Sequence, residues 1–364
     1  MVQRLLISGR AKTFRTALAV IILVSLTLIP ASAGKRQKTP PEQPWPELLL
    51  EGGRKLSYQQ TFSSERDVRA NPGFWGKLAN VVLGERDFTP LARPYGIAVD
   101  SHGRMIITDP AIGGVHIFDI AQHKYKLIDR LDKSKDPMTE PQCVAVDNKD
   151  NIYVTDSVAG KVFVFDPSGK SRRIFGSLKG GEGFFKRPTG IAIDPETQHV
   201  YVTDTLRDRV YVLDADGQVL RTFGQHGSAN GEFSLPTEIH IKNGTVAVVD
   251  SMNFRVQLFD REGAYQGSIG TGDPKGDIYR PKGIAIDSEG HIYLVEAEWG
   301  LVQVFDREGH LLYNFGNGTG FGRFLLPSGV AIDKNDRVYL VDSYNRRVQI
   351  FQYRALNERA AGAQ

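Results

Sequence analysis

Two ionisable residues alternate with isoleucines in one stretch of the chain. Glu238 and His240 lie in the run from Leu235 to Gly244, two residues apart in a segment that reads as a β-strand. Side chains two apart on a strand share a face and lie about 7 Å from each other. A carboxylate and an imidazole so placed could transfer protons or provide two ligands to a metal ion. The alternatives are contact with a bound ligand and a satisfied polar pair in the wall of a channel.

Nearly the same phrase occurs six times, so the two residues belong to a repeat. Each unit opens with a proline, and successive prolines are 45 to 48 residues apart: Pro94, Pro141, Pro188, Pro236, Pro281 and Pro327. Four units have Gly two residues after the proline, whereas the second has Cys143 and the fourth has Glu238. All units except the fourth have Ala where the fourth has His240. Since function is better sought where repeated units differ, the fourth unit is the first place to look.

Each unit reads as four short strands separated by turn residues, and a period of 45 to 48 residues is typical of a propeller blade. We therefore predict an all-β fold, a six-bladed β-propeller of four-stranded blades over residues 93–354. The sixth unit lacks a fourth strand, but Gly53 to Ser63 resembles the fourth strand of the third unit. We expect a strand at about 55–63 to complete the last blade and to close the ring, which removes open sheet edges. In the fourth unit, Asn243-Gly244 favours a tight two-residue hairpin, and the resulting register places Asp250 on the face opposite to Glu238 and His240.

The segments outside the repeat have their own signals. Apolar residues at helical spacing predict a short helix at about 72–84, within an N-terminal segment of 34–92. This helix could cap the central channel or pack on the flank of a blade. Residues 1–33 have a basic start, an apolar run of 17–29 and an Ala31-Ser32-Ala33 site, the pattern of a signal peptide. We expect an exported, periplasmic or extracellular protein without a stable membrane span, or a membrane-tethered one if the leader is not cleaved. Residues 355–364 form a polar tail.

Charge and cysteine content exclude some classes of function. Without the leader, 41 Lys and Arg face 42 Asp and Glu, so no basic surface for nucleic acid is expected. Cys143 is the only cysteine and has no disulfide partner. Its place in the repeat predicts a buried, inert thiol.

Two units contain the pattern Asp-Ser-x-Asn-x-Arg-Val, at 250–256 and 342–348. Together with Pro-x-Gly-Ile-Ala-Ile-Asp, this pattern resembles the NHL repeat family over roughly residues 93–354. Members of that family include RNA-binding domains, sensor domains and peptidylglycine-amidating lyases, and other six-bladed propellers include calcium-dependent lactonases. Exported bacterial members with no accompanying domain are similar mostly to binding or scaffolding modules. The resemblance implies the fold and leaves the function open.

Two further sets of residues are candidates. Every second strand ends in a carboxylate, which could form a metal-binding ring but is better explained by hydrogen bonds to nearby backbone N–H groups: Asp109, Asp156, Asp204, Asp250, Glu296 and Asp342. In the fifth unit, Trp299 replaces the Asn of the pattern and lies beside Glu296 and Glu298. A tryptophan in a loop could be a platform for a peptide or a sugar, or could pack under a neighbouring loop.

The sequence favours a non-enzymatic binding or scaffolding module that engages a protein, peptide or glycan of the cell envelope across one propeller face, with no cofactor and no nucleic acid. The alternative is a metal-dependent lyase or lactonase-like enzyme at the channel mouth of blades 4 and 5. That enzyme would use His240 and Glu238 in catalysis, and Ca²⁺ or Zn²⁺ bound by Glu238, His240 and Glu296. The residues expected to contact a ligand are Glu238, His240, Glu296, Glu298, Trp299, Asn253 and Arg255.

Overall fold

The structure is a computed structural model that describes residues 47–49, 54–69, 87–129, 137–178, 183–270, 277–316 and 323–354. The expected signal peptide at 1–33, the expected helix at about 72–84 and the polar tail at 355–364 lie outside these residues. Within the described ranges, no helix combines the length and the apolar character needed to cross a membrane.

Strands form where β-branched and aromatic residues are concentrated, as expected for side chains that pack on a pleated sheet. Blades 1 and 2 contain β3 (Ile97–Val99), β4 (Met105–Asp109), β5 (Gly114–Asp119) and β6 (Lys124–Ile128), then β7 (Pro141–Val146), β8 (Ile152–Asp156), β9 (Lys161–Phe165) and β10 (Ser171–Phe175). Blades 3 and 4 contain β11 (Pro188–Ile193), β12 (Val200–Asp204), β13 (Arg209–Leu213) and β14 (Val219–Phe223), then β15 (Pro236–Lys242), β16 (Thr245–Asp250), β17 (Arg255–Phe259) and β18 (Tyr265–Ile269). Blades 5 and 6 contain β19 (Pro281–Ile286), β20 (Ile292–Glu296), β21 (Leu301–Phe305) and β22 (Leu311–Phe315), then β23 (Val330–Ile332), β24 (Arg337–Asp342) and β25 (Arg347–Arg354).

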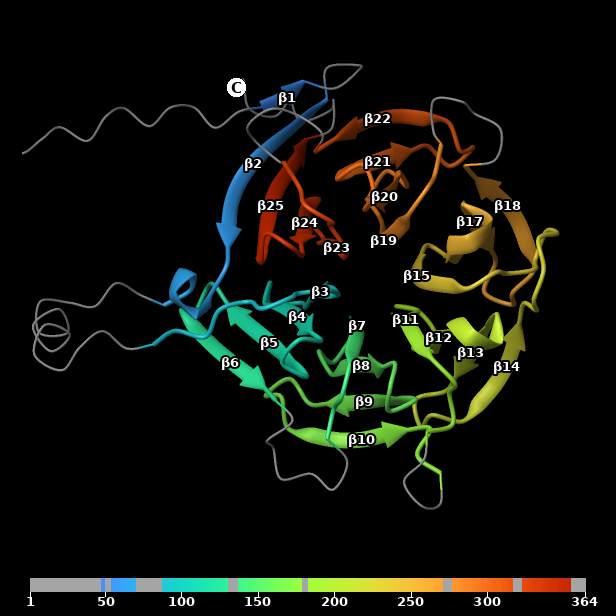
Figure 1. Cartoon of the computed structure of the whole chain (residues 1–364), viewed down its shortest axis with the longest axis horizontal. Coiled ribbons are helices and arrows are strands. Elements are labelled where there is room, and N and C mark those ends of the chain that lie inside the picture. Colours follow the sequence, from blue (N-terminus) through green and yellow to red (C-terminus); the bar gives the residue numbers. More distant parts are fainter. Residues whose placement is uncertain are drawn as a thin grey trace, which may run out of the picture. The chain divides into compact units, whose positions relative to one another are not determined.

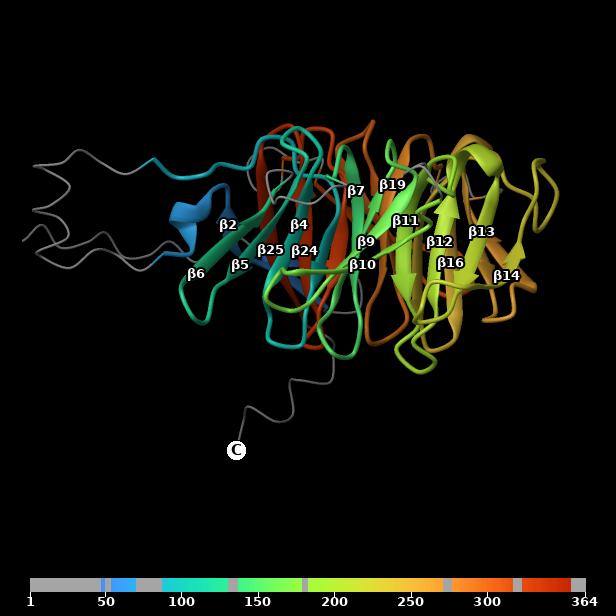
Figure 2. The same cartoon turned by 90° about the horizontal axis from the view of Figure 1, so that it is seen from below.

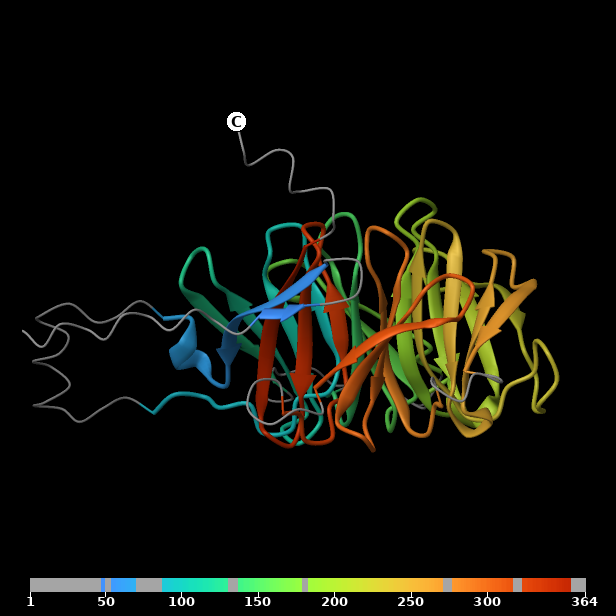
Figure 3. The same cartoon turned by 90° about the horizontal axis from the view of Figure 1, so that it is seen from above.

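The strands of each blade follow one another in the sheet and pair antiparallel. Figure 1 shows the six sheets arranged around a common centre, with the first strand of each blade (β3, β7, β11, β15, β19 and β23) nearest to it. The fourth strands, such as β14 and β18, lie at the periphery. The side views in Figures 2 and 3 show the sheets standing next to one another around the ring.

The hydrophobic core lies between neighbouring blades. Second strands such as β12 are buried along their whole length, whereas the peripheral β14 is largely exposed. Tyr201 and Val212 of blade 3 pack with Ile241 and Val248 of blade 4 in one cluster, and five similar clusters join the other pairs of adjacent blades in the described residues. Each blade therefore buries both of its faces only within the complete ring.

The ring closes as the sequence predicts. An N-terminal strand, β2 (Lys55–Phe62), pairs antiparallel with β25. The register runs from the residue pair Lys55 and Arg354 to the residue pair Phe62 and Val348. A further short strand, β1 (Glu47–Leu49), pairs with β2, so the last sheet has the order β1-β2-β25-β24-β23. The prediction of the closing strand is confirmed, and β1 is an addition that the repeat pattern does not contain.

Because the strands are antiparallel, the connections divide between two ends of the sheets. We call one end the loop face: it carries the loops between second and third strands, such as 297–300, and the connections that enter the first strands, such as 277–280. The other end is the hairpin face: it carries the turns between first and second strands, such as 243–244, and those between third and fourth strands, such as 260–264.

Candidate functional site

The carboxylates that end the second strands are structural parts of the blades. All six are fully buried. Asp109 accepts hydrogen bonds from the backbone N–H of Ala92 at 2.7 Å and of Arg93 at 3.1 Å. Each of the other five likewise accepts a hydrogen bond from the backbone of the connection that enters its own blade. The hydrogen-bonding role predicted for these carboxylates is confirmed, and Glu296 in particular is turned toward the backbone rather than toward Glu238.

Asn253 and Arg255, two of the expected ligand contacts, also serve their blade. Asn253 Nδ2 and Arg255 Nε donate to the same Asp250 oxygen, at 2.8 and 2.9 Å. The second guanidinium nitrogen of Arg255 donates to the carbonyl of Ala229 at 2.8 Å. Since Arg255 is buried and its donors are engaged, it holds the connection into blade 4 and has little freedom to bind a ligand.

Glu238 lies opposite Cys143 rather than beside His240. In β7, β11, β15 and β19 the register shifts directly after the proline, so Cys143 and Glu238 occupy β-bulges. A bulge redirects side chains and breaks the regular alternation of faces along a strand. The thiol of Cys143 donates to Oε1 of Glu238. No hydrogen bond joins Glu238 to His240 in the described structure, so the two residues do not form the satisfied polar pair that was one of the alternatives. Glu238 of blade 4 is paired with Cys143 of blade 2 instead.

The contact between blades 2 and 4 depends on the glycine of the blade between them. A β-carbon at Gly190 of blade 3 would lie 2.6 Å from the carbonyl oxygen of Thr237 and 2.8 Å from Cα of Glu238. Only glycine therefore lets β11 and β15 approach so closely at this level. The repeat predicts a small residue at the position of Gly190, but the sequence contains no signal that Cys143 and Glu238 contact each other beside it.

The surroundings of this pair favour the protonated form of both groups. Burial raises the pKa of Glu238 to about 7, although the Cys143 thiol, the Ile239 N–H and the charge of Lys282 act in the opposite direction. Burial and the neighbouring Glu238 carboxylate raise the pKa of Cys143 well above its usual range. A thiol held in its protonated form is a poor nucleophile, which agrees with the inert cysteine predicted from the sequence.

Lys282 and Tyr95 complete this group of side chains, which we call the axial cluster (Tyr95, Cys143, Glu238 and Lys282). The ammonium of Lys282 lies 6.0 Å from the centre of the Tyr95 ring, within the range of a cation–π contact. Burial lowers the pKa of Lys282, and the nearby Glu238 partly opposes that shift. The axial cluster thus combines a cation, an acid that titrates near neutrality, and a phenol.

His240 faces a separate, largely apolar space. It lines an axial cavity of about 170 Å³ whose other walls are apolar residues of the first strands, among them Ala98, Ala145, Ala192 and Ala331. Burial, with a smaller contribution from Lys242, lowers the pKa of His240 to about 4. The imidazole is therefore neutral at physiological pH, and among the described residues it has no hydrogen-bond partner.

The residues named for a metal ion do not converge. Glu238 points to Cys143, His240 faces the axial cavity, and Glu296 accepts the N–H of Tyr279 at 3.2 Å. Within the described ranges, the one group whose ligand atoms come together is Asp100, His102 and Asp150, in the hairpin face of blades 1 and 2. Both of those aspartates already accept hydrogen bonds within the turns.

Trp299 and Glu298 are exposed on the loop face, as a ligand platform requires. Trp299 is 51% exposed, and its ring meets the Tyr279 ring edge to face, with 5.6 Å between the centres. Glu298 forms an ion pair of 3.5 Å with Arg280, the residue after Tyr279. The aromatic pair is thus held by two connections of blade 5, and the sequence analysis missed Tyr279.

Trp299 is one member of a larger set on the loop face. Among the described residues, nine of the eleven large apolar side chains that are exposed lie in the loops and connections of this face: Val158, Leu178, Leu206, Met252, Phe254, Tyr279, Trp299, Leu325 and Tyr344. We call this set the apolar rim. Most of its members follow the second strand of their blade, so comparison of the repeats at that position could have found them.

Basic residues lie inside the apolar rim, where the first strands begin. Arg93, Arg187 and Arg280 directly precede the prolines of blades 1, 3 and 5, and all three are exposed. The charges of Arg187 and Arg280 act on Tyr95 of the axial cluster, so both guanidinium groups lie near that cluster. The loop face therefore combines a basic centre with an apolar rim.

Six sheets joined in sequence and closed by an N-terminal strand define a six-bladed β-propeller. A family model described as a 6-bladed beta-propeller matches residues 193–273, and the NHL repeat model matches residues 138–165 and 324–351. Two segments of the chain therefore match the NHL repeat, and the fold is the six-bladed propeller. A comparison with curated proteins finds no match.

Solved structures with this fold have diverse functions. Virginiamycin B lyase from Staphylococcus aureus is 15% identical with a TM-score of 0.52, and the match covers 74% of this chain and 86% of the lyase. A gluconolactonase from Xanthomonas campestris is 15% identical with a TM-score of 0.55, covering 84% of this chain and 92% of that one. A chain of the nidogen/laminin complex is 16% identical with a TM-score of 0.53, covering 78% and 97%. At these identities the similarity shows the fold alone.

Proposed function

We propose that this protein is an exported binding module without catalytic activity, and that its loop face engages an acidic peptide segment of a partner protein. The observation that carries the proposal is the apolar rim, because soluble monomers seldom expose large apolar side chains together on one face unless that face binds something. Protein interfaces are enriched in aromatic residues, methionine and arginine. The rim and the basic centre of the loop face contain all of these.

The chemistry of the face favours one kind of partner. Arg93 and Arg187 provide positive charge at the mouth of the channel, Arg280 beside them pairs with Glu298, and Lys282 of the axial cluster lies further in. A partner with carboxylates at its centre and apolar residues around them would match this distribution of charge and apolar surface. This pattern favours an acidic peptide over a neutral glycan.

The enzyme alternative has less support. Glu238, with its pKa near 7, has the protonation behaviour of a general acid or base. However, it bonds to a protonated thiol, His240 faces an apolar cavity, and Glu296 is engaged by backbone. A lyase or lactonase-like site with Ca²⁺ or Zn²⁺ would need these groups to rearrange.

Trp299→Ala tests the binding proposal. Peptides selected from a random display library on the immobilised wild-type protein should be acidic. Their affinity, measured by fluorescence anisotropy, should fall at least about tenfold in Trp299→Ala, as for the loss of a hot-spot aromatic residue. Leu220→Ala is the matched control, because Leu220 is similarly exposed but lies on the peripheral β14. Equal affinities for Trp299→Ala and the wild type would remove the rim from the binding site.

Export is the part of the proposal that rests on sequence alone. N-terminal sequencing of protein recovered from the cell envelope or the medium should show a chain that begins after Ala33. An intact leader on the recovered protein would instead indicate a membrane-tethered form.

A further inference from the structure

Blade 4 breaks a rule that the other five blades follow at the hairpin face. Where the first strand ends, the other blades have an aspartate: Asp100, Asp147, Asp194, Asp287 and Asp333. Each of these carboxylates accepts backbone N–H groups of the turn that follows, as Asp194 does from Glu196 at 3.0 Å. Blade 4 has Lys242 in this place, followed by the two-residue turn Asn243-Gly244. A negative charge is therefore replaced by a positive one, and the hairpin is shorter.

The missing carboxylate has a consequence for the next blade. In blade 4, Arg261 of the turn after the third strand reaches back to blade 3, where Nε donates to Asp194 at 2.8 Å and another nitrogen pairs with Glu196 at 2.6 Å. Arg307 has the same place in the turn Asp306-Arg-Glu-Gly309 of blade 5. The residue that would receive it in blade 4 is Lys242, whose ammonium donates to the carbonyl of Ile286 at 3.0 Å.

Arg307 consequently has no acidic partner. Among the residues that the structure describes, its guanidinium forms no hydrogen bond and no ion pair, whereas Arg261 forms both. Gly290 leaves room for this guanidinium, because a β-carbon there would collide with it. Asp260 is the acidic residue of the surrounding wall, but its carboxylate accepts the N–H groups of Glu262 and Ala264 in its own turn.

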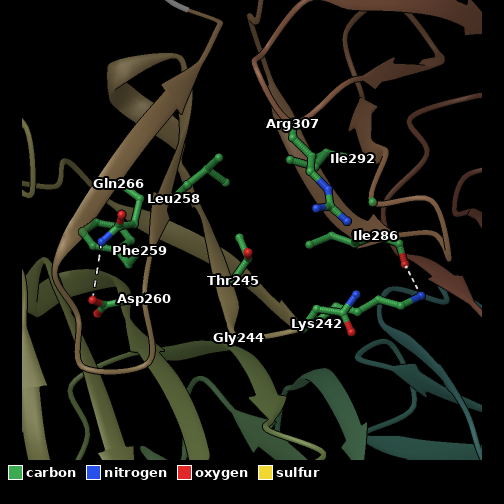
Figure 4. Close-up of a pocket in the computed structure, with 12 residues that line it drawn as sticks. Lys242, Gly244, Thr245, Leu258, Phe259, Asp260, Gln266, Ile286, Ile292 and Arg307 are labelled. Carbon is green, nitrogen blue, oxygen red and sulfur yellow. Dashed lines mark hydrogen bonds between the residues drawn. The ribbon is translucent and has the colours of Figure 1, made fainter.

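A cavity of about 430 Å³ lies where the aspartate and the longer hairpin are missing. Figure 4 shows Arg307 and Ile292 on the blade 5 side, Leu258 on the blade 4 side and Thr245 between them. The apolar part of the wall is formed by Leu258, Phe259, Ile286 and Ile292, and the polar part includes Arg307 and Gln266. A space with an apolar part and the unpaired guanidinium of Arg307 in its wall is complementary to a molecule with an apolar tail and one anionic end.

We propose that the cavity between blades 4 and 5 binds a small carboxylate with an apolar tail. The carboxylate pairs with Arg307, in the way that Asp194 pairs with Arg261, and a bidentate contact suits the planar guanidinium. The tail packs against Leu258, Ile286 and Ile292. This site is on the hairpin face and is independent of the binding proposed for the loop face, so Trp299→Ala should leave it unchanged.

Octanoate is the probe, and isothermal titration calorimetry of the folded wild-type protein is the measurement. Acetate should bind more than about a hundredfold more weakly, because each buried methylene contributes about 0.8 kcal/mol. Octanamide, which has the tail without the charge, should bind at least about tenfold more weakly. Octanoate that fails to bind, or that binds no better than acetate or octanamide, would overturn the proposal. Binding of inorganic phosphate by a protein that does not bind octanoate would also overturn the proposal.

Two variants assign the binding to this cavity. Arg307→Gln should weaken octanoate binding at least about tenfold, because the cation is lost. Lys242→Asp restores the residue type of the other blades and offers Arg307 an internal partner, so it should weaken octanoate binding by a similar factor. Lys149→Gln is the matched control. Lys149 lies in the turn between the first and second strands of blade 2, far from the cavity, and this variant should bind octanoate like the wild type. Wild-type affinity in both Arg307→Gln and Lys242→Asp would contradict the assignment, and circular dichroism melts verify that each variant is folded.

Discussion

At the scale of single residues, Glu238 is an acid whose surroundings raise its pKa. It bonds to the Cys143 thiol, and burial raises its pKa to about 7 from an ordinary value of 4.5. The unfolded chain therefore releases this proton from about pH 4.5, whereas the folded protein keeps it up to about pH 7. Since the folded state binds more protons in this window, the free energy of unfolding falls as the pH rises through it.

Glu238→Gln should remove this dependence. The measurement is the melting temperature of the variant minus that of the wild type, taken at pH 5 and at pH 8. We expect this difference to be more positive at pH 8. The comparison needs the difference because Glu296, whose pKa burial also raises to about 7, contributes to both proteins in the same window. Glu308→Gln, an exposed glutamate of blade 5, should show no such change. If the difference in melting temperature between Glu238→Gln and the wild type were the same at both pH values, the raised pKa of Glu238 would be refuted.

Comparison of the repeats identified Glu238, His240 and Trp299 as departures, and the structure places two of them at the channel and one on the loop face. It could not identify their partners. The contact of Glu238 with Cys143 joins residues 95 positions apart on blades that are not neighbours, and depends on the local bulges. The period-two rule for strands placed Glu238 and His240 together because it assumes a regular strand.

At the scale of elements, the convergence of first strands makes specific glycines necessary. Gly190→Ala would put a β-carbon 2.6 Å from the carbonyl oxygen of Thr237, so we expect a loss of about 1–3 kcal/mol in the free energy of unfolding. Gly267→Ala is the control, because no atom lies within 4 Å of a β-carbon at that position of β18. Urea denaturation of both variants measures the effect. Equal stabilities would mean that blades 3 and 4 separate more easily than their packing implies.

The repeat pattern predicted the strands of each blade well, because their apolar residues and turns recur at a fixed period. It gave no sign of β1, which lies outside the repeat and pairs only with β2. The significance of Lys242 also depends on structure: a lysine at a strand end is ordinary in a sequence. It matters because Arg307 of the next blade lies where Arg261 finds Asp194 in the preceding pair of blades.

At the scale of the whole molecule, stability depends on closure of the ring by β2. Leu56 and Phe62 of this strand are buried in the clusters that join blade 6 to blades 5 and 1. Without β2, the edge of β25 would expose unpaired backbone groups over Arg347–Arg354. Exposed strand edges pair with other chains, so a protein that lacks the closing strand should associate.

A chain that begins at residue 64 should therefore elute from size-exclusion chromatography as oligomers or aggregates, whereas a chain that begins at residue 34 should elute as a single small species. Addition of a peptide of residues 53–63 should restore the small species, because the peptide can pair with β25 in the register of β2. A peptide with the same composition in scrambled order is the control, since it lacks the alternation that places Leu56 and Phe62 in the core. If the chain that begins at residue 64 were monodisperse without the peptide, the five remaining blades and the three strands of blade 6 would be sufficient, and closure would contribute to specificity rather than to stability.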